Sequence, residues 1–213
     1  MWILEEETEE MTLKVPIRAD RGQMSREERQ SEIVTTAASL FKVGSYSATS
    51  MDDIARAAGL AKPTLYHYFE SKDKILFAIH EEVQDLLQAR HSARLAAGLA
   101  PNHMLFESMV DIMELAETMP GHQRVYVEQQ RELPMWAQDS LRVRKQEYFE
   151  AITAVIERGI EEGIFQTSAP QLVTRQIFGQ CTYFYQWYAV GSDPRVRDIA
   201  CVFWDNLMDG IEA

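Results

Sequence analysis

One short segment carries side chains that suit recognition of a nucleic acid. It reads Lys62-Pro63-Thr64-Leu65-Tyr66-His67-Tyr68. The hydroxyl and methyl groups of Thr64 fit a base edge or a thymine methyl, and the Lys62 ammonium can reach guanine O6 and N7. Tyrosine hydroxyls and a further lysine, Lys72, are donors that can bind phosphates. We therefore expect base contacts from Lys62, Pro63, Thr64, Tyr66 and His67, and phosphate contacts from Tyr66, Tyr68 and Lys72.

Two short helices within residues 51–69 must position that segment. They are joined by a turn of about three residues that contains Gly59, where we expect a positive φ. Ala55 and Ala58 are small where the two helices cross. This is the layout of a helix-turn-helix, in which the start of the second helix enters the major groove. The alternative is an ordinary helical hairpin whose aromatic side chains only pack.

Residues 25–80 contain an ordered series of motifs: Ile33 to Phe41 with Gly44, Ala48-Thr49-Ser50-Met51, Ile54-Ala55, Ala58-Gly59-Leu60, Thr64-Leu65-Tyr66-His67-Tyr68-Phe69 and Ser71-Lys72-Asp73-Lys74-Ile75-Leu76. In these motifs and their order, the segment resembles the N-terminal domain of the TetR family of transcriptional repressors. The resemblance covers about a quarter of the chain. The rest has the length and helix count that such a family's ligand-binding and dimerisation domain would show.

The resemblance implies a homodimeric repressor that binds a palindromic double-stranded DNA operator and releases it when a small effector binds. It adds Thr49 to the expected phosphate contacts. One position departs from the family pattern, because Ala61 stands where the family usually has Ser. A helix cap is therefore missing there, which puts affinity for DNA in question rather than the fold.

The whole chain reads as helical, and we expect an all-α fold with about nine helices. No stretch alternates between apolar and polar residues as a strand would. A capping box at Ser25-Arg-Glu-Glu28 marks the first start. Eight of the expected helices span about 25–44, 51–58, 62–69, 101–118, 122–133, 134–163, 170–190 and 194–211, and a long helix that begins at Ser71 follows the third of them. The helix from Ser71 is the expected lever between the two domains.

Charge is distributed unevenly along the chain. The net charge is −12, which argues against indiscriminate binding to nucleic acid or anionic membranes. Residues 1–20 carry 2 basic and 6 acidic side chains, residues 21–74 carry 8 and 7, and residues 75–213 carry 11 and 20. The middle segment is the least acidic, so we expect any polyanion to meet it.

The sequence predicts three regions. Residues 1–24 are expected to form a disordered acidic arm, residues 25–70 the DNA-binding domain, and residues 71–213 the effector-binding and dimerisation domain. The only two cysteines lack metal-ligand spacing, and there is no secretory signal or membrane-spanning run. We expect a cytoplasmic protein without a membrane partner, a metal or a cofactor.

The last two expected helices carry apolar side chains on more than one face, whereas a surface helix needs only one apolar face. We expect a dimer interface that includes Trp187, Val202 and Trp204; the alternative is a deeply buried helix pair in a monomer. Met and aromatic side chains also suit an adaptable apolar effector pocket, although each of them can equally be core. The expected pocket residues are Met109, Met113, Phe149, Phe178, Tyr183 and Trp187.

The stretch Arg131-Glu132-Leu133-Pro134 and the pair Trp187-Tyr188 resemble the TetR branch that senses acyl-CoA thioesters. An acyl-CoA is therefore one candidate effector, with the CoA phosphates needing local arginines such as Arg124, Arg131 or Arg175. Enzyme motifs are missing, so we do not expect an enzyme. The competing hypothesis is a helical protein-interaction module whose DNA-binding domain is vestigial.

Overall fold

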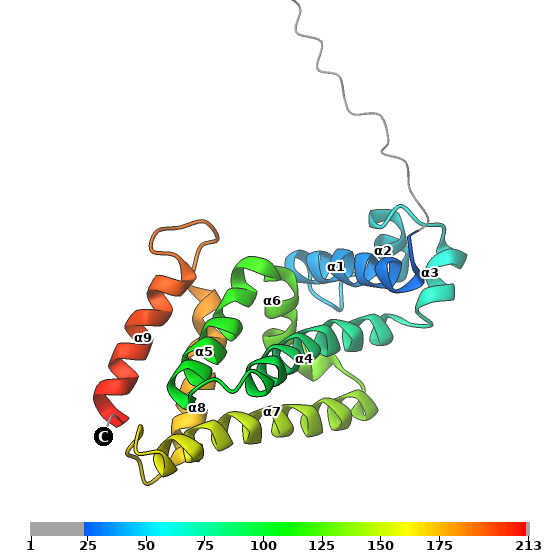
Figure 1. Ribbon diagram of the computed structural model, residues 1–213. Coiled ribbons are helices and arrows are strands. Elements are labelled where there is room, and N and C mark those ends of the chain that lie inside the picture. Colours follow the sequence, from blue (N-terminus) through cyan, green and yellow to red (C-terminus); the bar gives the residue numbers. More distant parts are fainter. Residues whose placement is uncertain (1–23, 212–213) are drawn as a thin grey trace, which may run out of the picture.

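The computed structural model describes residues 24–211, and within that range the chain forms nine α-helices and no strand (Figure 1). The expected all-α class is confirmed. Apart from Met24, the expected arm lies outside the described residues. The helices are α1 (Arg26–Gly44), α2 (Met51–Ala57), α3 (Lys62–Tyr68), α4 (Lys72–Ala96), α5 (Pro101–Thr118), α6 (Pro120–Glu128), α7 (Met135–Glu161), α8 (Pro170–Tyr183) and α9 (Val196–Ile211).

Side-chain caps set the starts of three of the first four helices. Ser25 and Glu28 form the expected capping box on α1, and Ser50 forms a second one with Asp53 on α2. At the start of α4, the Ser71 hydroxyl accepts a hydrogen bond from a backbone N–H of the first turn. Helix α3 follows Ala61 without a side-chain cap. These local signals explain why the helix starts predicted in this region agree closely with the observed ones.

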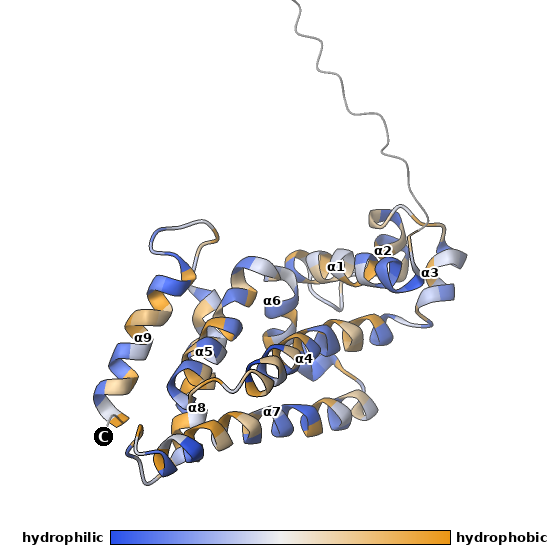
Figure 2. Cartoon of the chain, viewed as in Figure 1, coloured by the Kyte–Doolittle hydropathy of each residue, from blue (hydrophilic) through white to orange (hydrophobic). Residues whose placement is uncertain are grey.

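Two hydrophobic cores lie at opposite ends of the molecule. The first core is formed by α1 to α3 and the first turns of α4. Val125 of α6, Leu133 of the segment after α6 and Leu141 of α7 also belong to it. The second core surrounds α5 and draws on α4, α7, α8 and α9. In Figure 2, α7 alternates hydrophobic and hydrophilic residues along its length, as a helix with one buried side should. Helices α4 and α7 contribute buried residues to both cores, and α6 packs Tyr126 against the second.

Two predicted helices end earlier in the structure. The expected helix over 170–190 stops at Tyr183 and continues as a single 3₁₀ turn at Phe184–Gln186. This tight turn stacks the Phe184 ring on Tyr188, with ring centroids 4.6 Å apart, and brings Trp187 to 4.9 Å. The expected helix over 122–133 likewise ends at Glu128, followed by a 3₁₀ turn at Gln130–Glu132.

Helix α6 lies directly against α1. A Cβ atom on Gly121 would stand 3.1 Å from the backbone carbon of Ala38, so the two helices touch backbone to backbone. The Gln129 amide donates a hydrogen bond to the Phe41 carbonyl at 3.0 Å. On its other side, α6 approaches α4 through His122 and Glu82, whose side chains are 2.9 Å apart. The second core is thereby anchored to the first helix of the protein.

Gly121→Ala should destabilise the protein by ~1–3 kcal/mol, because the added methyl group must push α6 away from the α1 backbone. Denaturant unfolding followed by circular dichroism measures this free energy. Gly210→Ala in α9 is the matched control, since a Cβ there meets nothing within 4 Å. Equal effects of the two substitutions would contradict the close α1–α6 contact.

Candidate nucleic-acid interface and ligand cavity

The structure gathers the five expected base-contacting residues on one outward surface of α3. Leu65 is fully buried beneath the helix and fixes its orientation. Gly59 has a φ of +66°, as expected for the turn that leads into α3. The surface consists of the exposed side chains Lys62, Pro63, Thr64, Tyr66 and His67. This arrangement is the one that direct readout of a major groove requires; the individual contacts stay predictions.

The Lys62 ammonium forms an ion pair with a carboxylate of α2. Its Nζ lies 2.8 Å from the carboxylate of Asp52, and both side chains are more than half exposed. Hydrogen bonding to Asp52 raises the pKa of Lys62. Exposed ion pairs are weak, so this pair can open and release Lys62 toward a base.

Thr49 occupies a different position from the one expected of a phosphate ligand. Its side chain is buried, and its hydroxyl donates to the Ser45 carbonyl at 2.9 Å. Phosphate oxygens at neutral pH mainly accept hydrogen bonds, so they need a donor group. The single O–H of Thr49 is already donated to the Ser45 carbonyl. A phosphate contact by the Thr49 hydroxyl would require this hydrogen bond to open, and it stays a prediction.

Lys72 holds the loop between α1 and α2. Its Nζ donates to the carbonyls of Tyr46 at 2.7 Å and Thr49 at 2.8 Å, and lies 4.1 Å from the centre of the Tyr46 ring. The Tyr46 hydroxyl in turn donates to Asp73. Sequence reasoning missed this role of Tyr46, since the contacts link residues more than twenty positions apart. A phosphate contact by Lys72 stays a prediction, with one N–H left to make it.

The other two expected phosphate ligands are tyrosines of α3. Tyr66 is 43% exposed, whereas Tyr68 is half-buried. The Arg26 guanidinium lies 5.9 Å from the centre of the Tyr68 ring, which places a cation at the same edge of the domain. Their phosphate contacts also stay predictions.

A cavity of about 430 Å³ opens between α4, α5, α6, α7 and α8. Its apolar wall includes the two expected residues Phe149 and Phe178. Neutral polar groups face it from Gln84, Gln123 and Tyr126, which belong to α4 and α6. Its volume lies within the range of small-molecule sites. The lining also includes three cations, Arg142, Lys145 and Arg175, and a single carboxylate, Asp139.

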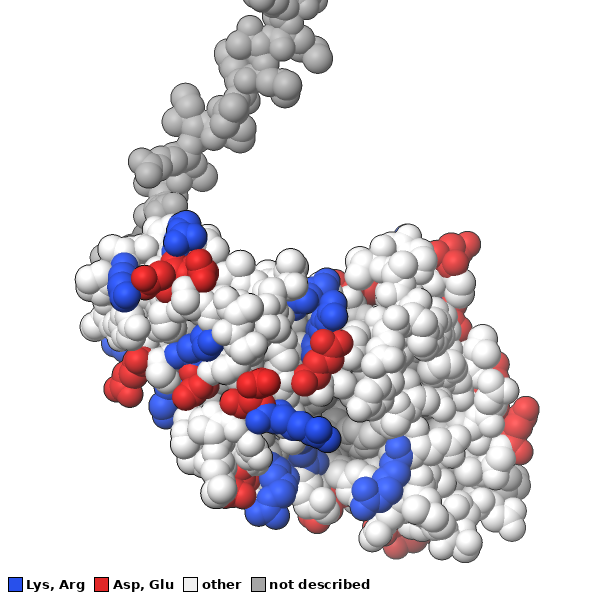
Figure 3. All heavy atoms as spheres, turned by 180° about the vertical axis from the view of Figure 1, so that it is seen from behind, with Lys and Arg blue, Asp and Glu red and all other residues white. Residues whose placement is uncertain are grey.

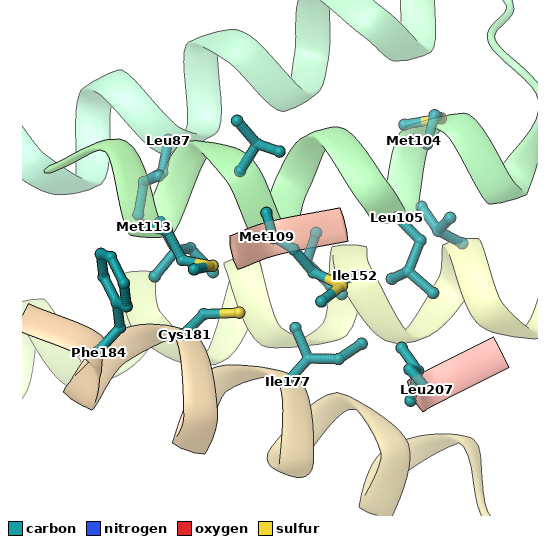
Figure 4. Packing of buried hydrophobic residues seen from close by; sticks show 14 of the residues in the cluster. Leu87, Met104, Leu105, Met109, Met113, Ile152, Ile177, Cys181, Phe184 and Leu207 are labelled. Atoms are coloured by element: carbon teal, nitrogen blue, oxygen red, sulfur yellow. The ribbon is translucent and has the colours of Figure 1, made fainter. Parts of the chain in front are cut away.

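Four expected pocket residues lie elsewhere. Met109 and Met113 are fully buried in the second core and lie beside Ile152 and Cys181 (Figure 4). Helix α5 turns this side toward α7 and α8, and the cavity meets α5 on another side. Tyr183, the last residue of α8, is 52% exposed, and Trp187 in the segment that follows is 62% exposed.

The cavity also holds polar groups whose hydrogen bonds are incomplete. The Gln84 amide donates to the Tyr126 hydroxyl. By contrast, Gln123 Oε1 and the Tyr148 hydroxyl are buried and make no hydrogen bond in the described part of the chain. Burial lowers the pKa of the Lys145 ammonium to about 8. Figure 3 shows a hollow in the surface of this face, with both basic and acidic side chains around it.

The expected dimer residues differ in exposure. Trp187 and Val202 are 62% and 57% exposed, and Leu172 and Tyr183 on α8 are exposed as well. Trp204 is only partly exposed and packs edge-on against Phe106 within its own chain, with ring centroids 5.6 Å apart. An exposed apolar surface therefore runs over α8, α9 and the segment between them.

Two absences are observed within residues 24–211. No group of three or more His, Cys, Asp or Glu side chains there could hold a metal ion. No helix in this range is both long and apolar enough to cross a membrane.

Comparison with known proteins adds relatives along most of the chain. The repressor KstR2 of Rhodococcus jostii strain RHA1 is 25% identical over 185 residues, which cover 86% of this chain and 91% of KstR2. The structure of PfmR from Thermus thermophilus, a TetR family transcriptional regulator, superposes with a TM-score of 0.77 and 26% identity. The superposition covers 85% of this chain and 99% of PfmR.

A third similar structure is AibR in complex with isovaleryl coenzyme A and operator DNA, with a TM-score of 0.75 and 23% identity. It covers 84% of this chain and 97% of AibR, and at this identity it shows the fold alone.

Two family models match consecutive parts of the chain. Residues 33–79 match the bacterial regulatory proteins of the tetR family. Residues 98–211, more than half of the chain, match the tetracyclin repressor-like C-terminal domain. Together with the exposed α3 surface of a helix-turn-helix, these matches show that the chain belongs to the TetR family of bacterial transcriptional regulators.

Proposed function

We propose that the protein is a cytoplasmic one-component repressor that binds a palindromic operator as a homodimer and releases it when a small molecule fills the cavity. The observation that carries the proposal is the shared position of α6. The same helix lines the cavity through Gln123 and Tyr126 and touches the α1 backbone at Gly121. A ligand that moves this wall must also move the DNA-binding helices.

Helix α4 provides a second connection, as the sequence suggested. It lines the cavity with Gln84 and Leu87, and its first turns bury Ile75 and Leu76 in the DNA-binding core. The effector would prefer the dimer in which the two α3 helices are wrongly spaced for successive major grooves, and would shift the population toward it. The helix that sequence reasoning missed is α6, whose contact with α1 joins segments about 80 residues apart.

An acyl-CoA thioester is the effector candidate that the sequence suggests. The resemblance to the acyl-CoA-sensing branch suggests it, and the AibR neighbour was solved with isovaleryl coenzyme A. The apolar wall formed by Leu87, Ile112, Leu115 and Phe178 suits an acyl group. Among the arginines considered from sequence, Arg175 lines the cavity, whereas Arg124 lines a separate hollow beside Tyr185.

Homodimerisation is proposed through the exposed surface of α8 and α9. Leu172, Gly179 and Tyr183 follow one another at helical spacing along the exposed side of α8. A glycine in such a row allows a partner helix to approach closely. A single short recognition helix also reads too few base pairs for specificity, so a dimer fits the function.

The direct test is fluorescence anisotropy of the purified protein on DNA from upstream of its own gene, against a scrambled fragment of equal length. We expect tighter binding to the upstream DNA, a steep salt dependence, and release by an effector. Equal, weak binding to selected and scrambled DNA at every salt concentration would favour the alternative, a helical interaction module.

Thr64→Ala should cost ~1–3 kcal/mol of binding free energy on the operator and less on unrelated DNA, because Thr64 is placed to read a base edge. Anisotropy titrations on both DNAs measure the two losses. Equal losses on the operator and on unrelated DNA would remove Thr64 from the base contacts.

Val202→Asp should convert the dimer to monomers, because it places a charge at the centre of the proposed α8–α9 interface. Light scattering coupled to size exclusion gives the mass directly. Val143→Asp is the matched control, since Val143 on α7 is similarly exposed at 52% against 57% for Val202. A Val202→Asp dimer as stable as the control would place the interface elsewhere.

A further inference from the structure

Two of the three cations in the cavity lack a carboxylate partner. Lys145 Nζ donates to the Gln130 side chain at 2.8 Å and lies 4.2 Å from the centre of the Tyr126 ring. The Arg175 guanidinium lies 5.0 Å from the centre of the Phe149 ring. Among the described residues, no carboxylate oxygen lies within 4 Å of either cation, whereas Arg142 pairs with Asp139 at 3.5 Å.

The missing counter-charge is costly at Lys145. Its ammonium is largely buried, and burial lowers its pKa to about 8. The neighbouring His80 supplies no charge, since burial and then Lys145 lower the pKa of its imidazole to about 3. A buried cation without an anion destabilises a fold, and an opposite charge beside it recovers much of that loss. The ligand-free cavity thus keeps a site for an anion.

The wall around these cations is apolar. Leu87, Ile112, Leu115 and Phe178 line the same cavity as Lys145 and Arg175. A bare inorganic anion would leave this wall in contact with water, and a neutral apolar molecule would leave the ammonium unpaired. Both parts of the lining are satisfied only by a molecule that carries an anionic group on an apolar body.

We propose that the cavity binds an amphipathic anion, with its charged group held by Lys145 and Arg175 and its apolar body against the wall of α4, α5 and α8. The assignment rests on the proposed effector role of the cavity and gives that effector its chemistry. Two sources share this chemistry: the carboxylate of a free organic acid, or a phosphate of its coenzyme A thioester.

The surroundings of the cavity favour the carboxylate. The adjoining hollows share Arg142, Gln146 and Arg175 with it, and they are lined by Glu147, Glu150 and Glu157. These carboxylates would repel the several negative charges of a coenzyme A head group lying across the opening. A single compact charge held inside the cavity avoids them.

A matched pair of dyes tests the proposal while the natural ligand is still unidentified. Anilinonaphthalene sulfonate and N-phenyl-1-naphthylamine share an apolar body, and only the first carries an anionic group. Fluorescence titration of the full-length protein, without DNA, gives both affinities. We expect the sulfonate to bind about tenfold more tightly or better, as one charge-assisted contact of ~1.4 kcal/mol would give.

Lys145→Met separates charge from shape, because it keeps the length of the side chain beside Tyr126. We expect it to weaken binding of the sulfonate about tenfold and leave the neutral dye unchanged. It should also raise the melting temperature of the ligand-free protein by about 2–4 °C, since a buried charge is removed. Arg142→Met is the control, and its effect should stay below about twofold because the Arg142 side chain is 77% exposed, where water screens its charge.

The outcomes are distinct. Equal affinities of the two dyes, or a Lys145→Met variant that binds the sulfonate as well as the unaltered protein does, would overturn the proposal. Displacement of the dye by a free acid, by its thioester or by both identifies the source of the anion, whereas displacement by the methyl ester alone would contradict it. Failure of the proposed function would appear separately, as a protein that binds the anionic dye through Lys145 but no operator.

Discussion

The contact between the backbones of α1 and α6 is the constraint that joins the two halves of the molecule. It requires the absence of a side chain at Gly121, where a methyl group would stand 3.1 Å from Ala38. Gln129 reinforces it through the Phe41 carbonyl. Because α6 also lines the cavity, the cavity wall and the DNA-binding domain share one rigid element. Packed helices that touch so closely cannot slide independently.

Local chemistry explains why the DNA-binding domain could be predicted well. Ser25 with Glu28 and Ser50 with Asp53 define helix starts through contacts three residues apart. Gly59 adopts the positive φ expected from its place in the turn. Since each signal involves neighbours in sequence, it can be recognised before the rest of the fold is known. The outward surface of α3 then follows from the burial of Leu65.

Long-range packing explains what could not be predicted. Helical spacing shows that Met109 and Met113 lie on an apolar side of α5, but not whether that side faces core or cavity. After α8 ends, Phe184 is fully buried whereas Trp187 is 62% exposed, and helical spacing alone would place these two residues on the same side. Lys145 reads in sequence as one more surface lysine, and only its place between Gln130 and Tyr126 shows it to be a partly buried cation.

The central claim is that the cavity and the DNA-binding surface are linked through α6 and α4. Linkage is reciprocal, so a ligand that weakens operator binding must itself bind more weakly to the operator-bound dimer, by the same factor. The most direct measurement is therefore the affinity of a cavity ligand with and without saturating operator DNA. The account predicts that the ligand binds the operator-bound dimer more weakly than the free dimer. The factor should equal the one by which the ligand weakens operator binding. Identical affinities in the two states would contradict it.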